Sequence, residues 1–64
     1  MNRVRLAEII VSLQQSTDNE VLEYEHEFEA MLDDLPWDER VGWEGAWQEA
    51  QDKQIEWNEF IREA

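Results

Sequence analysis

The feature that most constrains the fold is a regular spacing of apolar residues across the middle of the chain. Five of them are separated by three, four, three and four positions: Val21, Tyr24, Phe28, Met31 and Leu35. This alternation places all five on one face of an α-helix, whereas a half-buried strand would need a period of two. Leu22 and Leu32 widen the same stripe. The spacing therefore predicts an amphipathic helix in the middle of the chain.

Capping residues and a proline mark the ends of this helix. Thr17, with Glu20 three positions later, fits a capping box, in which the threonine hydroxyl bonds to the backbone amide of the fourth residue. Pro36 disfavours helical geometry in Leu35 and is tolerated in the first turn of a following helix. The middle helix is thus expected to begin after Thr17 and to end at Leu35.

Similar stripes flank the middle helix. A first helix, roughly from Arg3 to Gln15, is predicted by i, i+3, i+4, i+7 spacing of Leu6, Ile9, Ile10 and Leu13. A third helix from Pro36 to Glu63 is predicted by spacings of four and three in Trp43, Trp47, Ala50, Gln54, Trp57 and Ile61. The expected fold class is all-α, a small helical bundle or helical hairpin with about three helices. We expect one acidic helical domain over residues 1–64.

Two glycines leave alternatives open for the third helix. Gly42 and Gly45 each cost about 1 kcal/mol relative to alanine inside a helix. Gly42, Ala46 and Ala50 fall at i, i+4 and i+8, and we expect this strip of small residues to pack closely against another helix. The alternative is a break between Gly42 and Gly45, which would give four helices.

The predicted helices differ in length. A third helix of ~27 residues would run ~40 Å, while a middle helix of ~17 residues runs only ~25 Å. The end that carries Trp57, Phe60 and Ile61 would then project as an exposed apolar patch. A 64-residue chain with no cysteine has a small core and no disulfide to support it, so a second copy that covers the patch would also stabilise the fold. We therefore expect a homodimer.

Acidic residues dominate the composition. The chain has 17 Asp and Glu against 5 Lys and Arg, a formal net charge of -12, and residues 17–39 contain ten acids and no Lys or Arg. On a helical wheel these acids flank the apolar seam in two columns, Glu20, Glu23, Glu27 and Asp34 in one and Glu25, Glu29 and Asp33 in the other. No basic residue at i+4 neutralises either column, and unrelieved like charge destabilises a compact fold. This pattern suggests that a partner uses the charge.

A basic partner surface suits these columns. Carboxylates at i, i+3, i+4 and i+7 are separated along a helix by ~4.5 to 10.5 Å, comparable with the phosphate spacing of a nucleic-acid strand. In composition and size the chain resembles the small acidic DNA-mimic inhibitors that phages and mobile elements make against host DNA-binding proteins. The resemblance implies a basic, nucleic-acid-binding protein as the partner, and it carries no motif from which residue roles could be transferred. The expected partner-binding acidic face comprises Glu20, Glu23, Glu25, Glu27, Glu29, Asp33, Asp34, Asp38 and Glu39.

Four tryptophans support an alternative function. Each aromatic side chain buries ~150 to 250 Å², so core packing is their simplest role. Trp37, beside Pro36, and the C-terminal group of Trp57, Phe60 and Ile61 can instead anchor a protein interface. The alternative is a hydrophobic interaction module, such as an assembly chaperone, antitoxin or adaptor, that uses the third helix. Direct binding of nucleic acid is not expected, because a net charge of -12 repels phosphates.

Catalytic and metal chemistry are not expected. Ser12 and Ser16 have no histidine near them in sequence, and no glycine-rich loop could shape an oxyanion or phosphate site, so we expect no enzyme. Glu23 and His26 have the Glu-x-x-His spacing of di-iron bundles. The apolar seam centres opposite His26, however, so both side chains should face water. We expect neither a metal site nor a cofactor.

No membrane segment is expected either. A membrane span needs ~20 consecutive apolar residues, and no stretch of this chain approaches that length. The apolar run after Arg3 and Arg5 is interrupted by Glu8 and is not followed by a small-residue cleavage site, so it does not fit a signal peptide. We expect a soluble, cytoplasmic protein.

Overall fold

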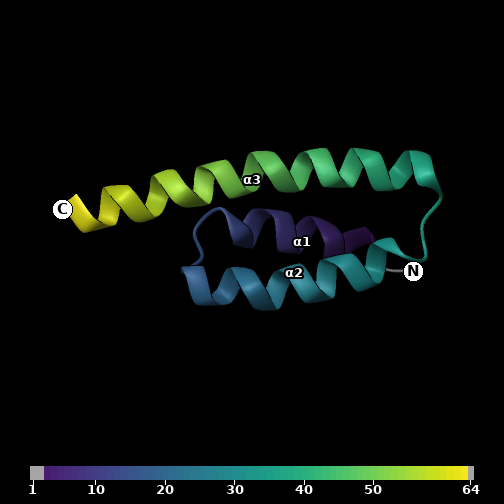
Figure 1. The fold of residues 1–64 in the computed structure, drawn as a ribbon, viewed down its shortest axis with the longest axis horizontal. Coiled ribbons are helices and arrows are strands. Elements are labelled where there is room, and N and C mark those ends of the chain that lie inside the picture. The colour runs from purple at the N-terminus through teal and green to yellow at the C-terminus, as the bar shows by residue number, and fades with distance from the viewer. Residues whose placement is uncertain (1–2, 64) are drawn as a thin grey trace.

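The structure is a computed structural model and describes residues 3–63. These residues form three helices and the segments that connect them. Helix α1 spans Arg3–Leu13, α2 spans Asp18–Leu32 and α3 spans Trp37–Glu63. The predicted all-α class with three helices is confirmed. In Figure 1, α1 lies between α2 and α3. Of the expected domain over residues 1–64, residues 1–2 and 64 lie outside the described residues.

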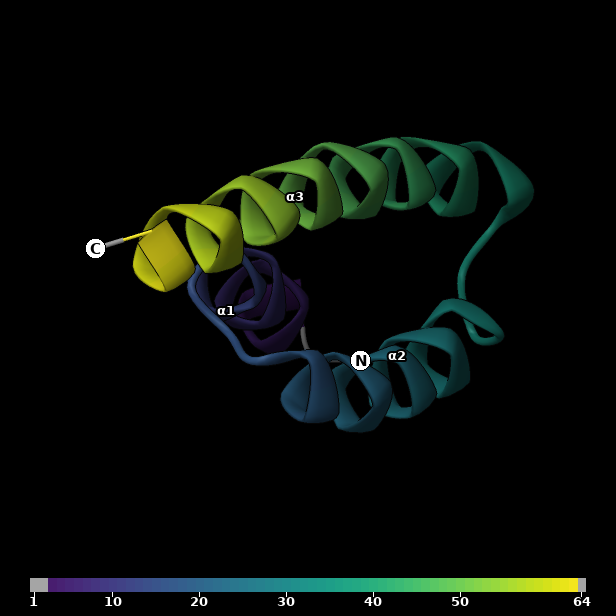
Figure 2. The same cartoon turned by 60° about the vertical axis from the view of Figure 1, so that its left-hand side comes forward.

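The core is centred on α1. Its predicted stripe supplies three fully buried side chains, Leu6, Ile9 and Leu13. Around them pack Val21, Phe28, Leu32, Leu35, Trp47 and Ala50 from the rest of the chain. α1 packs against both α2 and α3. Figure 2, which shows α1 nearly end-on, shows α2 and α3 separating from each other to one side of α1.

The ends of α2 follow from the capping residues. Thr17 Oγ1 accepts a hydrogen bond from the backbone N–H of Glu20 at 3.4 Å and donates one to Glu20 Oε1 at 3.0 Å. The predicted cap at Thr17 is thus confirmed. At the other end α2 stops at Leu32, before the predicted Leu35, because the last turn tightens: the N–H of Leu35 bonds to the carbonyl of Leu32 at 3.0 Å. This turn still returns the Leu35 side chain to the core.

A buried polar cluster ties the α1–α2 turn to α3. Gln54 is only 2% exposed, and its Nε2 donates to the carbonyl of Ser16 and to Oδ1 of Asp18, each at 3.0 Å. Asn58 Nδ2 donates to the same Ser16 carbonyl at 2.9 Å, and the buried Ser16 hydroxyl donates to the carbonyl of Ser12 at 2.7 Å. Buried polar groups need such partners. This cluster therefore fixes the point at which α3 passes the turn.

Helix α3 is continuous through both glycines, so the alternative of a break between Gly42 and Gly45 is wrong. The expected strip of small residues is also wrong in part. Ala50 is buried against the core, but apart from the adjoining residues and the backbone of α3 itself, no atom lies within 4 Å of a Cβ placed at Gly42 or Gly45. The register that buries Trp47 and Ala50 turns Gly42 to the solvent, where it packs against nothing.

The C-terminal part of α3 extends beyond the other two helices (Figure 1). α3 has 27 residues and α2 has 15, and the last buried residue of α3 is Gln54. Beyond it lie two exposed aromatic residues, Trp57 at 36% and Phe60 at 66%, whose rings stack with centroids 6.1 Å apart. The overhang predicted from the helix lengths is therefore present, and it leaves Ile61 half exposed as well.

Candidate protein-interaction site

Two arginines of α1 pair with carboxylates of the other two helices and so neutralise part of the negative charge. Arg5 donates through Nε and Nη2 to both carboxylate oxygens of Glu27 on α2, the second at 2.9 Å. Arg3 Nη2 lies 2.8 Å from Glu39 Oε1 on α3. These partners are 22 and 36 positions apart, so a search for partners at i+4 could not find them. Glu27 and Glu39, which sequence reasoning placed on the partner surface, are engaged within the protein.

Two weaker pairs complete the ion pairs of residues 3–63. Arg5 Nη1 lies 3.5 Å from Glu8 Oε2 on the same helix. Arg62 Nη2 lies 3.6 Å from Asp18 Oδ2, with both side chains 71% exposed. Exposed pairs of this kind contribute little to stability. The two shortest ion pairs, Arg5–Glu27 and Arg3–Glu39, are both made by arginines of α1.

The contact with Arg5 also changes the acidity of Glu27. The hydrogen bond from the guanidinium lowers the pKa of the Glu27 carboxyl, and the positive charge of Arg5 acts in the same direction against partial desolvation. The same hydrogen bond raises the pKa of Arg5. Glu27 therefore stays anionic to lower pH than an ordinary glutamate.

The other members of the expected acidic face are in no ion pair within the described chain. Glu20 accepts a hydrogen bond from Thr17, and Glu25 is partly buried. The others are exposed: Glu23, Glu29, Asp33, Asp34 and Asp38. The structure thus divides the face into two engaged carboxylates and seven that remain available to a partner.

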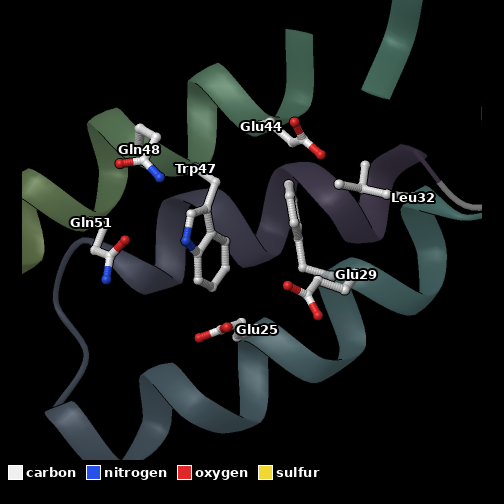
Figure 3. Close-up of a pocket in the computed structure, with 8 residues that line it drawn as sticks. Glu25, Glu29, Leu32, Glu44, Trp47, Gln48 and Gln51 are labelled. Atoms are coloured by element: carbon white, nitrogen blue, oxygen red, sulfur yellow. The ribbon is translucent and has the colours of Figure 1, made fainter. Parts of the chain in front are cut away.

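Two of the available carboxylates line a groove between α2 and α3. The groove has a volume of about 330 Å³, at the small end of the range for binding pockets. Its residues on α2 are Glu25, Phe28, Glu29 and Leu32, and those on α3 are Glu44, Trp47, Gln48 and Gln51. Figure 3 looks into it with α1 behind, and the two glutamates of α2 lie across from the polar side chains of α3. We call it the α2–α3 groove.

The floor of the α2–α3 groove is aromatic. The Phe28 ring centroid lies 5.0 Å from that of Trp47, with the rings tilted by 35°, and 6.5 Å from that of Trp43 in an edge-to-face arrangement. Phe28 and Trp47 are both buried, so they form a packed base under walls of carboxylates and amides. Sequence reasoning missed the α3 wall. The feature of the sequence that indicates this wall is the spacing of Glu44, Gln48 and Gln51 at i, i+4 and i+7, beside Trp47.

A second hollow continues the groove towards the α2–α3 turn. It shares Glu29, Leu32 and Glu44 with the first and adds His26, Ala30, Asp33 and Arg40. The Nε of Arg40 is buried and has no hydrogen-bond partner among the described residues. Together the two hollows carry four carboxylates, Glu25, Glu29, Asp33 and Glu44, against one guanidinium.

The four tryptophans divide between core and surface. Trp47 is buried and Trp43 packs against the core, whereas Trp37 is 73% exposed at the start of α3. Trp57 stands on the overhang with Phe60. All four residues expected to be interface anchors are therefore exposed. Trp37 lies at the start of α3, and Trp57, Phe60 and Ile61 lie near its end, so they do not form a single patch.

Glu23 and His26 both lie exposed on α2. Within residues 3–63 no three His, Cys, Asp or Glu side chains are grouped so that they could hold a metal ion. Over the same residues no helix combines the length and apolar character needed to cross a membrane. Comparisons of the chain with models of protein families, with curated proteins and with solved structures find no match.

Proposed function

We propose that this chain binds a basic, nucleic-acid-binding protein through its unpaired carboxylates and so keeps nucleic acid away from that protein. The observation that carries this proposal is the division of the acidic residues. Four of the 17 are in ion pairs within residues 3–63, which leaves 13 without one. Arginines of the chain therefore pair with only a minority of its carboxylates within the described residues.

The length of the molecule supports the same function. The longest dimension is 41 Å, so a net charge of -12 corresponds to about one negative charge per 3.4 Å (41/12). Duplex DNA carries one per ~1.7 Å of axis, or one per ~3.4 Å for each strand. The chain thus presents the linear charge density of about one nucleic-acid strand.

Binding would act by competition. Lysine and arginine side chains that neutralise phosphates can pair with carboxylates held on the rigid helices α2 and α3, and a helix keeps the spacing of these carboxylates fixed. Opposite net charges would also speed the encounter, an effect that salt weakens. In this proposal the chain is an inhibitor of the kind that phages and mobile elements encode, and it acts in the cytoplasm, where its target meets nucleic acid.

A second candidate function rests on the overhang of α3. Trp57, Phe60 and Ile61 are exposed together, and exposed apolar patches mark interaction sites. A second copy seated there would give the expected homodimer, and a partner protein would make the chain a hydrophobic adaptor. Sedimentation at micromolar concentration tests the dimer: we expect about twice the 7.7 kDa chain mass and a shift towards monomer in Trp57→Ala. A monomer at every concentration would remove the dimer.

Affinity capture with two variants separates the two functions. The charge variant combines Glu23→Gln, Glu29→Gln, Asp34→Asn and Asp38→Asn, and the apolar variant combines Trp57→Ala with Phe60→Ala. The immobilised wild-type chain should capture nucleic-acid-binding proteins from a host-cell lysate and should release them when a short DNA duplex or salt is added. The charge variant should lose them, and the apolar variant should keep them. The captured proteins could instead remain bound when DNA or salt is added and be lost only by the apolar variant. That result would contradict the proposed function and favour the hydrophobic adaptor.

A further inference from the structure

The α2–α3 groove has the dimensions of a helix-binding site. Together with the second hollow that continues it, the groove extends along α3 from Arg40 to Gln51, a rise of about 16 Å or three helical turns, and along α2 from Glu25 to Asp33. α1 packs against α2 and α3 from the other side, so the three helices occupy three positions of a bundle and leave a fourth open. A helix of three or four turns fits this opening.

The lining specifies the charge of such a helix. An apolar side chain that enters the groove would contact Trp47, Phe28 and Leu32 at its base. Docking also removes water from Glu25, Glu29 and Glu44. Removing water from a carboxylate without giving it a new partner would weaken the complex. The occupant must therefore bring lysine or arginine on both sides of its apolar stripe. Arg40, at the turn end, offsets only one of the four negative charges.

A second copy of this chain does not meet that requirement. The apolar residues that it leaves exposed at the end of α3 are interspersed with Glu56, Glu59 and Glu63, which outnumber the two basic residues of that segment, Lys53 and Arg62. These acids would meet the carboxylates of the groove. The arginines at the start of α1 are already engaged with Glu27 and Glu39. Self-docking in this groove is therefore opposed by charge.

We propose that the α2–α3 groove docks a basic amphipathic helix of the target protein, with the apolar face on the aromatic floor and the basic residues paired to Glu25, Glu29 and Glu44. This inference rests on the proposed function and makes it more specific. The target is then a protein whose nucleic-acid-binding surface includes an exposed basic helix. The chain would bind that helix in one place instead of covering it with diffuse charge.

The indole N–H signals of the four tryptophans can locate the binding site in solution. The probe is a synthetic helical peptide of about 18 residues, because shorter isolated helices are marginal in water. It carries leucine at i, i+3, i+4 and i+7 with arginine on both flanks, and a control peptide has glutamate in place of each arginine. We expect the basic peptide to shift the Trp47 signal of the ¹⁵N-labelled chain more than the Trp57 signal, and the acidic peptide to shift neither.

Two variants of equal charge test the same proposal by affinity. The groove variant combines Glu25→Gln, Glu29→Gln and Glu44→Gln. The control variant combines Glu49→Gln, Asp52→Asn and Glu59→Gln, three exposed acids of α3 that do not line the groove and form no ion pair with any residue from 3 to 63. The groove variant should bind the basic peptide at least about tenfold more weakly, and the control variant within about twofold of wild type. Circular dichroism melting of both variants establishes that they fold.

The outcomes separate this proposal from the function on which it rests. If both variants weaken binding equally and the signals of all four tryptophans move alike, the groove proposal is overturned and diffuse mimicry remains. A shift confined to Trp57 would place docking on the overhang and would also overturn it. If the wild-type chain does not distinguish the basic from the acidic peptide, both the groove and the proposed function fail.

Discussion

The two sides of α2 carry the same kind of residue with different neighbours. On the side that faces α1, both oxygens of Glu27 accept hydrogen bonds from Arg5. On the side that faces the α2–α3 groove, Glu25 and Glu29 have no ion pair within the described residues and lie across from Glu44. These three of the glutamates of α2 fall within five consecutive positions. The contrast shows that the helix beside each carboxylate decides whether it serves the fold or remains available to a partner.

The placement of α1 explains this division. Residues 1–16 carry two arginines and one glutamate, whereas the following segment, residues 17–39, is wholly acidic among its charged residues. Placing α1 between the two acidic helices lets Arg5 and Arg3 neutralise one carboxylate on each. The groove side receives no such helix. Among the described residues that line the groove and its continuation, Arg40 is the only arginine or lysine, so the negative charge stays largely uncompensated.

The largest effect is expected where the two sides of α2 meet. Phe28 is 2% exposed and contacts both Trp43 and Trp47. Phe28→Ala should lower the free energy of unfolding by about 3 to 5 kcal/mol, because it leaves a cavity in the core. A domain of this size has only about 3 to 10 kcal/mol in total, so the variant should be close to unfolding at room temperature. Urea denaturation measures the loss, and Phe28→Leu, which keeps most of the apolar contact, should lose less. A curve like that of wild type would mean that Phe28 does not hold α2 to α3.

The second-largest loss of stability is expected at Gln54, which ties the α1–α2 turn to α3. Gln54→Leu keeps the size of the side chain but removes the donor to the Ser16 carbonyl and to Asp18. We expect a loss of about 0.5 to 1.5 kcal/mol, the usual net contribution of a hydrogen bond, because Asn58 still donates to the Ser16 carbonyl. Thermal melting checks it, and Gln51→Leu, on the same helix but partly exposed, is the matched control. Equal melting temperatures for the two variants would show that the buried cluster does not fix the turn.

A smaller effect should distinguish the two sides of α2 directly. Glu27→Gln should lower the melting temperature, because it removes the charge that Arg5 pairs with. Glu29→Gln should leave the melting temperature unchanged or raise it, since it removes one of several unpaired like charges. The two substitutions are matched in chemistry and lie two positions apart on α2. If Glu29→Gln destabilised the chain as much as Glu27→Gln, the two sides would not differ in the way proposed.

The smallest effect is a dependence on pH. The pKa of Glu27 is lowered in the folded state, so its contribution to stability is fully present above the unfolded pKa, ordinarily about 4.3. It is lost as the pH falls through the lower, folded value. The difference in melting temperature between wild type and Glu27→Gln should therefore be constant near neutral pH and should shrink below about pH 4. A difference that did not change as the pH fell would show that the side chain acts through packing and not through its charge.

Local patterns predicted much of the fold, and distant pairings decided the site. The apolar spacing and the cap at Thr17 depend on neighbours within a few positions, so the three helices and the overhang of α3 could be predicted. The pairing of Arg5 with Glu27 could not, because it depends on how α1 lies against α2. The groove was missed for the same reason. Its α3 wall, which includes Glu44, meets Glu25 and Glu29 only after the helices pack.

Side-chain carboxyl ¹³C signals provide the most direct test that paired and unpaired carboxylates have different roles. An oligolysine peptide would be titrated into the labelled chain at neutral pH and moderate salt, and each glutamate signal followed separately. The predicted result is that Glu25, Glu29 and Glu44 shift as the peptide binds, while Glu27 and Glu39 stay in place because arginines of α1 already hold them. Shifts of Glu27 and Glu39 as large as those of the groove glutamates would contradict the account.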